Sequence, residues 1–287
     1  MRAKGWKVLA AWGISASLLL AGCGASEQTT GGSAVQGGNA GSQGQVASEV
    51  TLKVGAAPVP HAEILEFIKP ALKEQGVNLE VIILDDEGQL NPALHEKQID
   101  ANFFQHVPYL DSVKTEKGYD FTVTTKVHVE PIGFYSDKWK DKDELKEGAK
   151  IGLPNNPSNE FRALVLLQEQ GLIKLREGLT TYEATPRDIA DNPKNLEFVE
   201  AEAATLPRAL PDLDGAVINT NVVLEAKIDP NTALFREGAN SPYANVIVVR
   251  KGDEDRDEIK KLDAALTSPE VKAFIQDKYG VAVVPAF

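Results

Sequence analysis

Cysteine is nearly absent from the sequence, because only Cys23 among the 287 residues carries a thiol. A single cysteine forms no intramolecular disulfide and excludes zinc sites built on several thiolates. Histidine is also scarce, and no short paired spacing links the four histidines, His61, His95, His106 and His128. We therefore predict no metal and no cofactor, and keep a metal site made of these histidines and carboxylates as an alternative.

Catalytic signatures are missing as well. The sequence contains no G-x-S-x-G, no Walker-type loop and no H-E-x-x-H. We therefore predict that the protein is not an enzyme. No basic stripe is interleaved with aromatic residues, and the formal net charge of −12 predicts repulsion from nucleic acid.

Long apolar runs are absent except near the start of the chain. Residues 8–22 form an apolar run that is shorter than the roughly 20 residues of a membrane-spanning helix. A basic beginning precedes this run, formed by Arg2, Lys4 and Lys7. The pattern predicts a lipoprotein signal peptide over residues 1–22. Small residues directly before Cys23 resemble a bacterial lipobox, which predicts diacylglycerol attachment at that sulfur; a buried free cysteine is the alternative.

The segment after the signal peptide is rich in Gly, Ser, Gln and Thr and almost uncharged. This composition predicts that residues 23–49 form a flexible, lipid-anchored tether. Two or more acyl chains bind a bilayer stably. We therefore expect the protein on the outer face of the cytoplasmic membrane, or on the periplasmic side of an envelope membrane.

Strand-like and helix-like patterns alternate along the rest of the chain. In the first half, strands are expected at residues 51–57, 77–84, 101–105 and 121–135. Helical spacing occurs between these strands, at residues 64–72, 91–98 and up to about 117. This order predicts an α/β fold with a mostly parallel sheet.

The second half continues the alternation. Strands are expected at residues 149–154, 196–202, 215–220 and 245–251, and helices at 158–170, 204–211 and 254–279. We predict two α/β lobes, residues 50–135 with 245–287 and residues 136–244, in a monomeric protein. Lobes of this kind bind ligands in the crevice at the carboxyl ends of their strands.

The stretch "NNPSNEFRAL" (155–164) follows a predicted strand and opens a helix, with Ser158 or Asn159 as the expected N-cap. Backbone N–H groups at a helix start favour an anion, and Arg162 adds a bidentate cation one turn later. Together they predict a seat for a carboxylate. Ordinary capping beside a surface arginine is the alternative.

Two further stretches carry candidate ligand contacts. "ANFFQHVPYL" (101–110) brings Phe103, Phe104, His106 and Tyr109 to one strand-to-helix turn, which is either an aromatic pocket wall or core. "KVHVEP" (126–131) sets His128 and Glu130 on one face of a strand, either in the cleft or on a solvated edge.

Seven stretches, in order from about residue 54 to 250, resemble the NlpA-type substrate-binding lipoproteins of methionine-uptake ABC transporters. They are "VGAAPVPHAEILEFIKP", "DANFFQHVPYL", "KVHVEPIGFYS", "NEFRALVLLQEQGLIKL", "NPKNLEFVE", "LPRALPDLDGAVIN" and "SPYANVIVVR". The resemblance implies a two-lobed fold of the periplasmic-binding-protein type, with a ligand cleft between the lobes. It also implies capture of a free amino acid, with L-methionine as the expected ligand, and delivery to an ABC permease and its ATPase.

The resemblance also implies roles for single residues. Arg162 looks like the partner of the ligand carboxylate, and Asn219 and Asn245 look like partners of the amino-acid head. Phe104, His106 and Tyr109 look like the side-chain pocket, with Asn159 and Glu130 as weaker additions; the aromatic turn adds Phe103 as a further candidate. Glu87 and Val222 stand where related proteins often carry tyrosine. Another amino acid or a methionine-containing dipeptide therefore remains an alternative ligand. A structural surface lipoprotein is a separate alternative.

Overall fold

The structure is a computed structural model that describes residues 49–179, 182, 184–238 and 241–287. The predicted signal peptide, Cys23 and all of the predicted tether except residue 49 lie outside the described residues. Within the described part, no helix combines the length and the apolar character that crossing a membrane requires.

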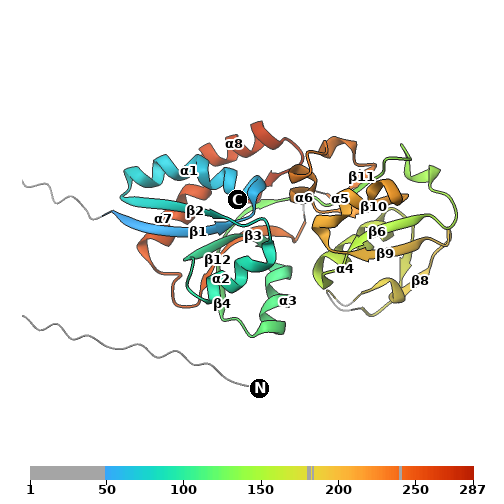
Figure 1. Cartoon of the computed structure of the whole chain (residues 1–287), viewed down its shortest axis with the longest axis horizontal. Helices are drawn as coiled ribbons and strands as arrows, with labels where there is room; N and C mark the ends of the chain where they lie inside the picture. The colour runs from blue at the N-terminus through green and yellow to red at the C-terminus, as the bar shows by residue number, and fades with distance from the viewer. Residues whose placement is uncertain (1–48, 180–181, 183, 239–240) are drawn as a thin grey trace, which may run out of the picture. The chain divides into compact units, whose positions relative to one another are not determined.

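The first lobe is built on a six-stranded sheet (Figure 1). The strand order is β13 (Val284–Pro285), β4 (Phe121–Val129), β12 (Ala244–Arg250), β3 (Ala101–His106), β1 (Val50–Ala56) and β2 (Val77–Ile83). One face is covered by α1 (Glu63–Glu74), α7 (Asp257–Leu266) and α8 (Pro269–Tyr279), and the other by α2 (Leu90–His95) and α3 (Val107–Lys117). Ile247 and Val249 pack into one core and Val246 and Val248 into the other, which explains why β12 is apolar almost throughout.

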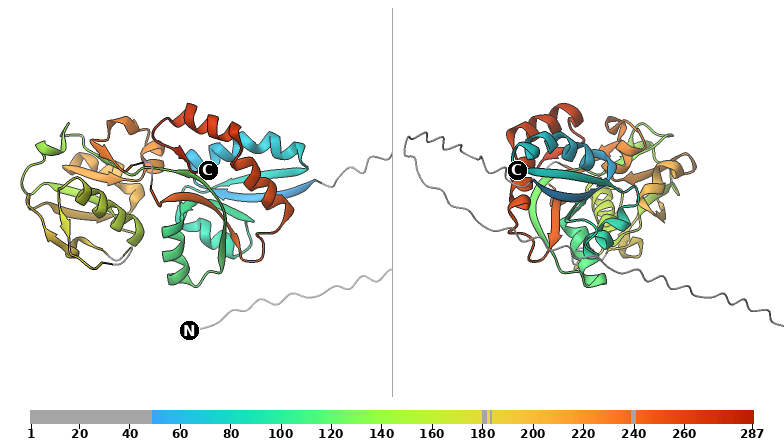
Figure 2. Two further views of the ribbon diagram at one scale, coloured as in Figure 1. Left: turned by 180° about the vertical axis from the view of Figure 1, so that it is seen from behind. Right: turned by 60° about the vertical axis from the view of Figure 1, so that its left-hand side comes forward.

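The second lobe is built on a five-stranded sheet. Its order is β11 (Phe235–Arg236), β5 (Gly133–Tyr135), β10 (Gly215–Ile218), β6 (Lys150–Pro154) and β9 (Glu197–Ala201). A core on one face contains α4 (Pro157–Glu169), and a core on the other contains α5 (Leu206–Ala209) and α6 (Thr220–Glu225). A small ribbon joins β7 (Lys174–Leu175) to β8 (Ile189–Asp191). Figure 2 shows the two sheets from two further directions.

The α/β fold expected from the alternating pattern is confirmed, but the expectation of mostly parallel sheets is wrong. β1 runs parallel to β2 and β3, and β6 runs parallel to β9 and β10. β12 runs antiparallel to β3 and β4, and β5 runs antiparallel to β10 and β11. The physical reason is that β5 and β12 are the first strands after the chain crosses between lobes, so no βαβ unit fixes their direction.

Two element boundaries also differ from the expectation. β5 belongs to the second sheet but begins three residues before residue 136, the predicted start of the second lobe. The helix expected over residues 254–279 is two helices, because Pro269 cannot continue α7 and instead opens α8, which Ser268 caps by accepting the Val271 N–H at 3.3 Å.

The chain crosses between the sheets twice, between β4 and β5 and between β11 and β12. The first crossing contains Glu130, and the second contains Glu237 and Tyr243. Thr220 at the start of α6 donates a hydrogen bond of 2.6 Å to the Pro131 carbonyl and so ties α6 to the first crossing.

Candidate functional site

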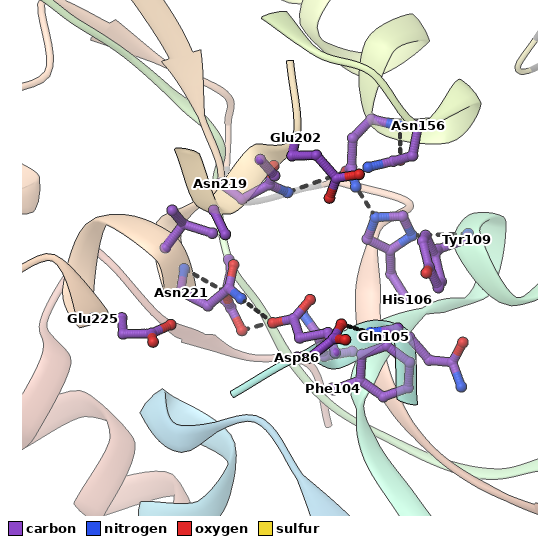
Figure 3. Close-up of a pocket in the computed structure, with 18 of the residues that line it drawn as sticks. Asp86, Phe104, Gln105, His106, Tyr109, Asn156, Glu202, Asn219, Asn221 and Glu225 are labelled. Carbon is purple, nitrogen blue, oxygen red and sulfur yellow. Dashed lines mark hydrogen bonds between the residues drawn. The ribbon is translucent and has the colours of Figure 1, made fainter. Parts of the chain in front are cut away.

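A cleft of about 710 Å³ is lined by residues of both lobes and of the first crossing. The first lobe contributes Asp85, Asp86, Glu87, Gly88, Phe104, Gln105, His106 and Tyr109. β12 of the first lobe adds Asn245, and the first crossing adds Glu130. The second lobe contributes Asn155, Asn156, Asn159, Arg162, Glu202, Ala203, Ala204, Asn219, Asn221, Val222 and Glu225. Figure 3 shows His106 and Tyr109 facing Asn219 and Asn221 across the opening.

His106 joins the two lobes. It ends β3 and caps α3, where its Nδ1 accepts the Tyr109 N–H at 3.1 Å. Its Nε2 therefore carries the proton and donates to Asn159 Oδ1 on α4 at 3.0 Å. Burial, followed by the charge of Arg162, lowers the pKa of His106 to about 3. His106 is thus a neutral donor at physiological pH.

The helix that carries Arg162 begins differently from the sequence prediction. Pro157 takes the first helical position, and the cap is Asn156, which accepts the Asn159 N–H at 3.0 Å, instead of Ser158 or Asn159. Proline is favoured at this position because its missing N–H would be unpaired there. The cap therefore pairs one of the free N–H groups at the start of α4. Arg162 is the principal cation of this region.

Arg162 is 3% exposed and is already engaged within the protein. Its Nε donates to the two carboxylate oxygens of Glu237 at 3.2 and 3.1 Å, and its Nη2 donates to Glu237 and, at 2.7 Å, to the Glu130 carbonyl. The Tyr243 ring stacks against the guanidinium at 4.3 Å. The fork that the sequence assigned to a ligand thus holds Glu237, and within the described residues Nη1 has no protein partner.

Glu130 lies at the base of the cleft and is held by two buried histidines. Its Oε1 accepts hydrogen bonds from His128 Nε2 at 2.7 Å and Asn245 Nδ2 at 3.3 Å, and lies 3.3 Å from His61 Nε2. Its Oε2 accepts the Asn221 N–H at 2.9 Å. Burial would raise the pKa of Glu130, but His61, His128 and Arg162 outweigh burial and lower it. The cleft therefore holds an ionised carboxylate.

The ligand atoms of His61, His128 and Glu130 lie within 4.8 Å of one another, close enough to hold a metal ion. Burial, partly offset by Glu130, lowers the pKa of His61 to about 4, so this ring is neutral. Both Nε2 atoms point at the same carboxylate, and both Nδ1 atoms are buried without a partner in the described residues. A hydrogen-bonded support for Glu130 accounts for this arrangement without a metal.

The asparagines expected at the amino-acid head lie in the cleft. Asn245 bridges His61 and Glu130, since its Oδ1 lies 3.2 Å from His61 Nε2. Asn219 donates from Nδ2 to Asn159 Oδ1 at 3.1 Å, while its own Oδ1 is buried with no partner in the described residues. Asn219 Oδ1 is thus an acceptor available to a ligand donor.

The aromatic stretch divides between cleft and core. Phe104 and Tyr109 line the cleft and meet edge to face at 5.9 Å. Phe103 does not line it, contrary to the prediction, because alternation along β3 turns its ring into the core against His61 and His128. The pocket wall therefore contains three of the four predicted rings, Phe104, His106 and Tyr109.

A family model described as NlpA lipoprotein matches residues 52–287. The chain belongs to the NlpA lipoprotein family. This NlpA-family chain is 42% identical to the methionine-binding lipoprotein MetQ of Bacillus subtilis, over 81% of the chain and 86% of the relative. It is 41% identical to the D-methionine-binding lipoprotein MetQ of Salmonella typhi, over 77% and 82%.

Solved structures show the same fold. A nutrient binding protein from Burkholderia cenocepacia bound to methionine superimposes with a TM-score of 0.80 at 46% identity, over 82% of this chain and all of that one. An ABC transporter periplasmic substrate-binding protein from Coxiella burnetii gives a TM-score of 0.78 at 42% identity, over 82% and 100%. The NlpA-family chain therefore has the two-lobed fold of these binding proteins.

Sequence reasoning missed several residues of this NlpA-family chain that line the cleft or hold Arg162. They are Asn156, Glu202, Asn221, Glu225, Glu237 and Tyr243. Asn156 had a readable signal, since asparagine directly before a helix-opening proline is a frequent N-cap. Glu237 had no readable signal in the sequence, because its contact with Arg162 spans 75 residues.

Proposed function

We propose that the chain is the substrate-binding lipoprotein of an ABC importer, which captures a free amino acid and delivers it to a permease and its ATPase. The observation that carries this function is a guanidinium and an ionised carboxylate side by side in one cleft. Arg162 Nη2 donates to the Glu130 carbonyl at 2.7 Å, and the Glu130 carboxylate faces the same cleft. This pair complements the carboxylate and the ammonium of an α-amino acid.

The head of the ligand is assigned to named atoms. The ligand carboxylate approaches Arg162 Nη1, and its ammonium approaches Glu130, with Asn219 Oδ1 as a further acceptor. Asn159 and Asn245 complete the polar surroundings of the head. The ligand side chain packs against Phe104 and Tyr109, together with His106. Methionine is the first ligand to test, because relatives and a solved neighbour are named for it.

Binding between the lobes couples recognition to closure. The His106–Asn159 hydrogen bond and the Asn221–Glu87 hydrogen bond both join the first lobe to the second. A ligand that contacts both lobes stabilises the closed form by its differential affinity for that form. The importer therefore receives a protein whose conformation reports that ligand is bound.

Attachment to the membrane completes the proposal. Lipid at Cys23 holds a monomeric binding protein at the outer face of the cytoplasmic membrane, or at the periplasmic side of an envelope membrane. The residues that bind ligand lie well beyond the tether, between residues 87 and 245. Binding and anchoring are thus separate tasks of one chain, and neither requires catalysis.

Calorimetry on the purified lipoprotein tests the function. The protein is unfolded and refolded to remove any ligand carried through purification and is then titrated with L- and D-amino acids and methionine-containing dipeptides. Saturable 1:1 binding of an amino acid is the expected result. If no amino acid or dipeptide binds to protein that has regained its folded circular dichroism spectrum, the proposed function is wrong.

A further inference from the structure

Glu87 is held in the cleft by a fixed turn. Asp86 caps the 3₁₀ turn Glu87–Gln89 by accepting the Gly88 N–H at Oδ1, at 3.0 Å, and the Gln89 side chain at Oδ2, at 3.3 Å. Glu87 Oε1 accepts a hydrogen bond of 2.6 Å from Asn221 Nδ2 across the cleft. The carboxyl group is therefore positioned, although related proteins often carry tyrosine at this place.

Hydrogen bonds place Glu87 next to the proposed head site. Arg162 contacts the Glu130 carbonyl, the Glu130 carboxylate accepts the Asn221 N–H, and the Asn221 side chain reaches Glu87. Asn221 thus lies between Glu130, the proposed partner of the ligand ammonium, and Glu87, and it contacts both. Glu87 also lines the same cleft as Phe104 and Tyr109, the proposed side-chain pocket.

Carboxyl groups outnumber fixed cations among the described residues that line the cleft. Six carboxyl residues line the cleft, Asp85, Asp86, Glu87, Glu130, Glu202 and Glu225. Among the described lining residues, Arg162 is the only fixed cation, and it is paired with Glu237. Burial, followed by the charges of Glu130 and Glu225, raises the pKa of Glu87 to about 8. Glu87 is therefore mostly protonated in the cleft at neutral pH, and a cation placed beside it would favour its ionised form.

Resting on the proposed function, we propose that Glu87 determines specificity: it selects an α-amino acid whose side chain ends in an ammonium or guanidinium group over one with an apolar end. The Phe104 and Tyr109 rings pack against the aliphatic part of such a side chain. Its terminal N–H groups donate to Glu87, with Glu225 on the same lining. A thioether offers neither a charge nor a donor to these carboxyl groups.

Lysine and norleucine test this assignment, because norleucine has the same straight carbon chain without the terminal ammonium. Calorimetry on the ligand-stripped protein is expected to give lysine an affinity at least about tenfold above that of norleucine, the effect of one charge-assisted hydrogen bond. Glu87→Gln, which keeps the shape and the acceptor oxygen, is expected to remove most of that preference. Glu87→Tyr is expected to favour methionine and norleucine over lysine. Glu66→Gln on α1, outside the cleft, is the matched control.

The outcomes separate the two proposals. If norleucine or methionine binds wild type as tightly as lysine, the specificity proposal is wrong and the amino-acid function stands. If Glu87→Gln keeps the lysine preference of wild type, Glu87 is not its source, which also overturns the proposal. If neither Glu87 variant folds, the wild-type ratio of lysine to norleucine affinity decides. If no amino acid binds at all, the proposed function itself fails.

Discussion

Arg162→Ala is the most direct test of the proposed head site, because it removes the fixed cation that faces the ligand carboxylate. Only Nη1 is available to a ligand, since Nε and Nη2 are engaged by Glu237 and the Glu130 carbonyl. One hydrogen bond from a charged donor contributes about 1.5–3 kcal/mol. The variant also leaves Glu237 without its partner beside the ligand, which raises the expected loss to about 2–5 kcal/mol.

Comparison of an amino acid with its amide isolates this contribution. Calorimetry with methionine and with methioninamide is expected to show a large loss of affinity for methionine and a smaller one for the amide, which lacks the carboxylate charge. Arg176→Ala is the control, because Arg176 is an exposed arginine paired with Asp188 and lies outside the cleft. Equal losses for both ligands, in a folded variant, would refute the assignment of Arg162 to the carboxylate. Unchanged methionine affinity would refute it as well.

Three further predictions concern other parts of the chain. Cys23→Ala should release the protein from membranes in a fractionation assay and leave ligand affinity unchanged; loss of both would contradict the separation of anchor and cleft. Glu130→Gln should weaken methionine at least about tenfold but weaken its desamino analogue little, measured by calorimetry. Unfolding in urea should show wild type losing stability relative to His106→Asn as pH drops from about 6.5 towards 4, because His106 is neutral when folded and binds a proton when unfolded. This one group changes the difference between the two proteins by about 1.4 kcal/mol per pH unit, so a difference that does not vary with pH would contradict its lowered pKa.

Local sequence pattern predicted the elements well but not how distant elements combine. Alternating hydrophobicity identifies β1, α1 and β2 within a residue or two, because their side-chain periodicity reflects burial. Strand direction is a tertiary property, which is why the mixed sheets were missed. The aromatic stretch shows the same limit, since alternation separates Phe103 from Phe104 but does not say which face is the cleft.

The part of the candidate site that depends on local sequence pattern was predictable. Arg162 was found because a helix start and a cation lie within one turn. The support of Glu130 by His61 was not found, because the two residues come from different elements and meet through the fold. The hydrogen bond from Asn221 to Glu87 spans 134 residues and leaves no local trace. Sequence reasoning thus identified individual cleft residues and missed the residues that hold them.

In the proposed site, Arg162 would link ligand recognition to the crossings between the lobes. The first crossing contacts Arg162 through the Glu130 carbonyl, and the second contacts it through Glu237 and the Tyr243 ring. A hinge must lie in such crossings, because they are the covalent connections between the two sheets. A ligand carboxylate at Nη1 therefore acts on a side chain that already bridges both connections. This arrangement explains why an arginine with a fork already filled by Glu237 still suits a carboxylate site: the internal partners fix the guanidinium, so that less side-chain entropy is lost when the ligand binds.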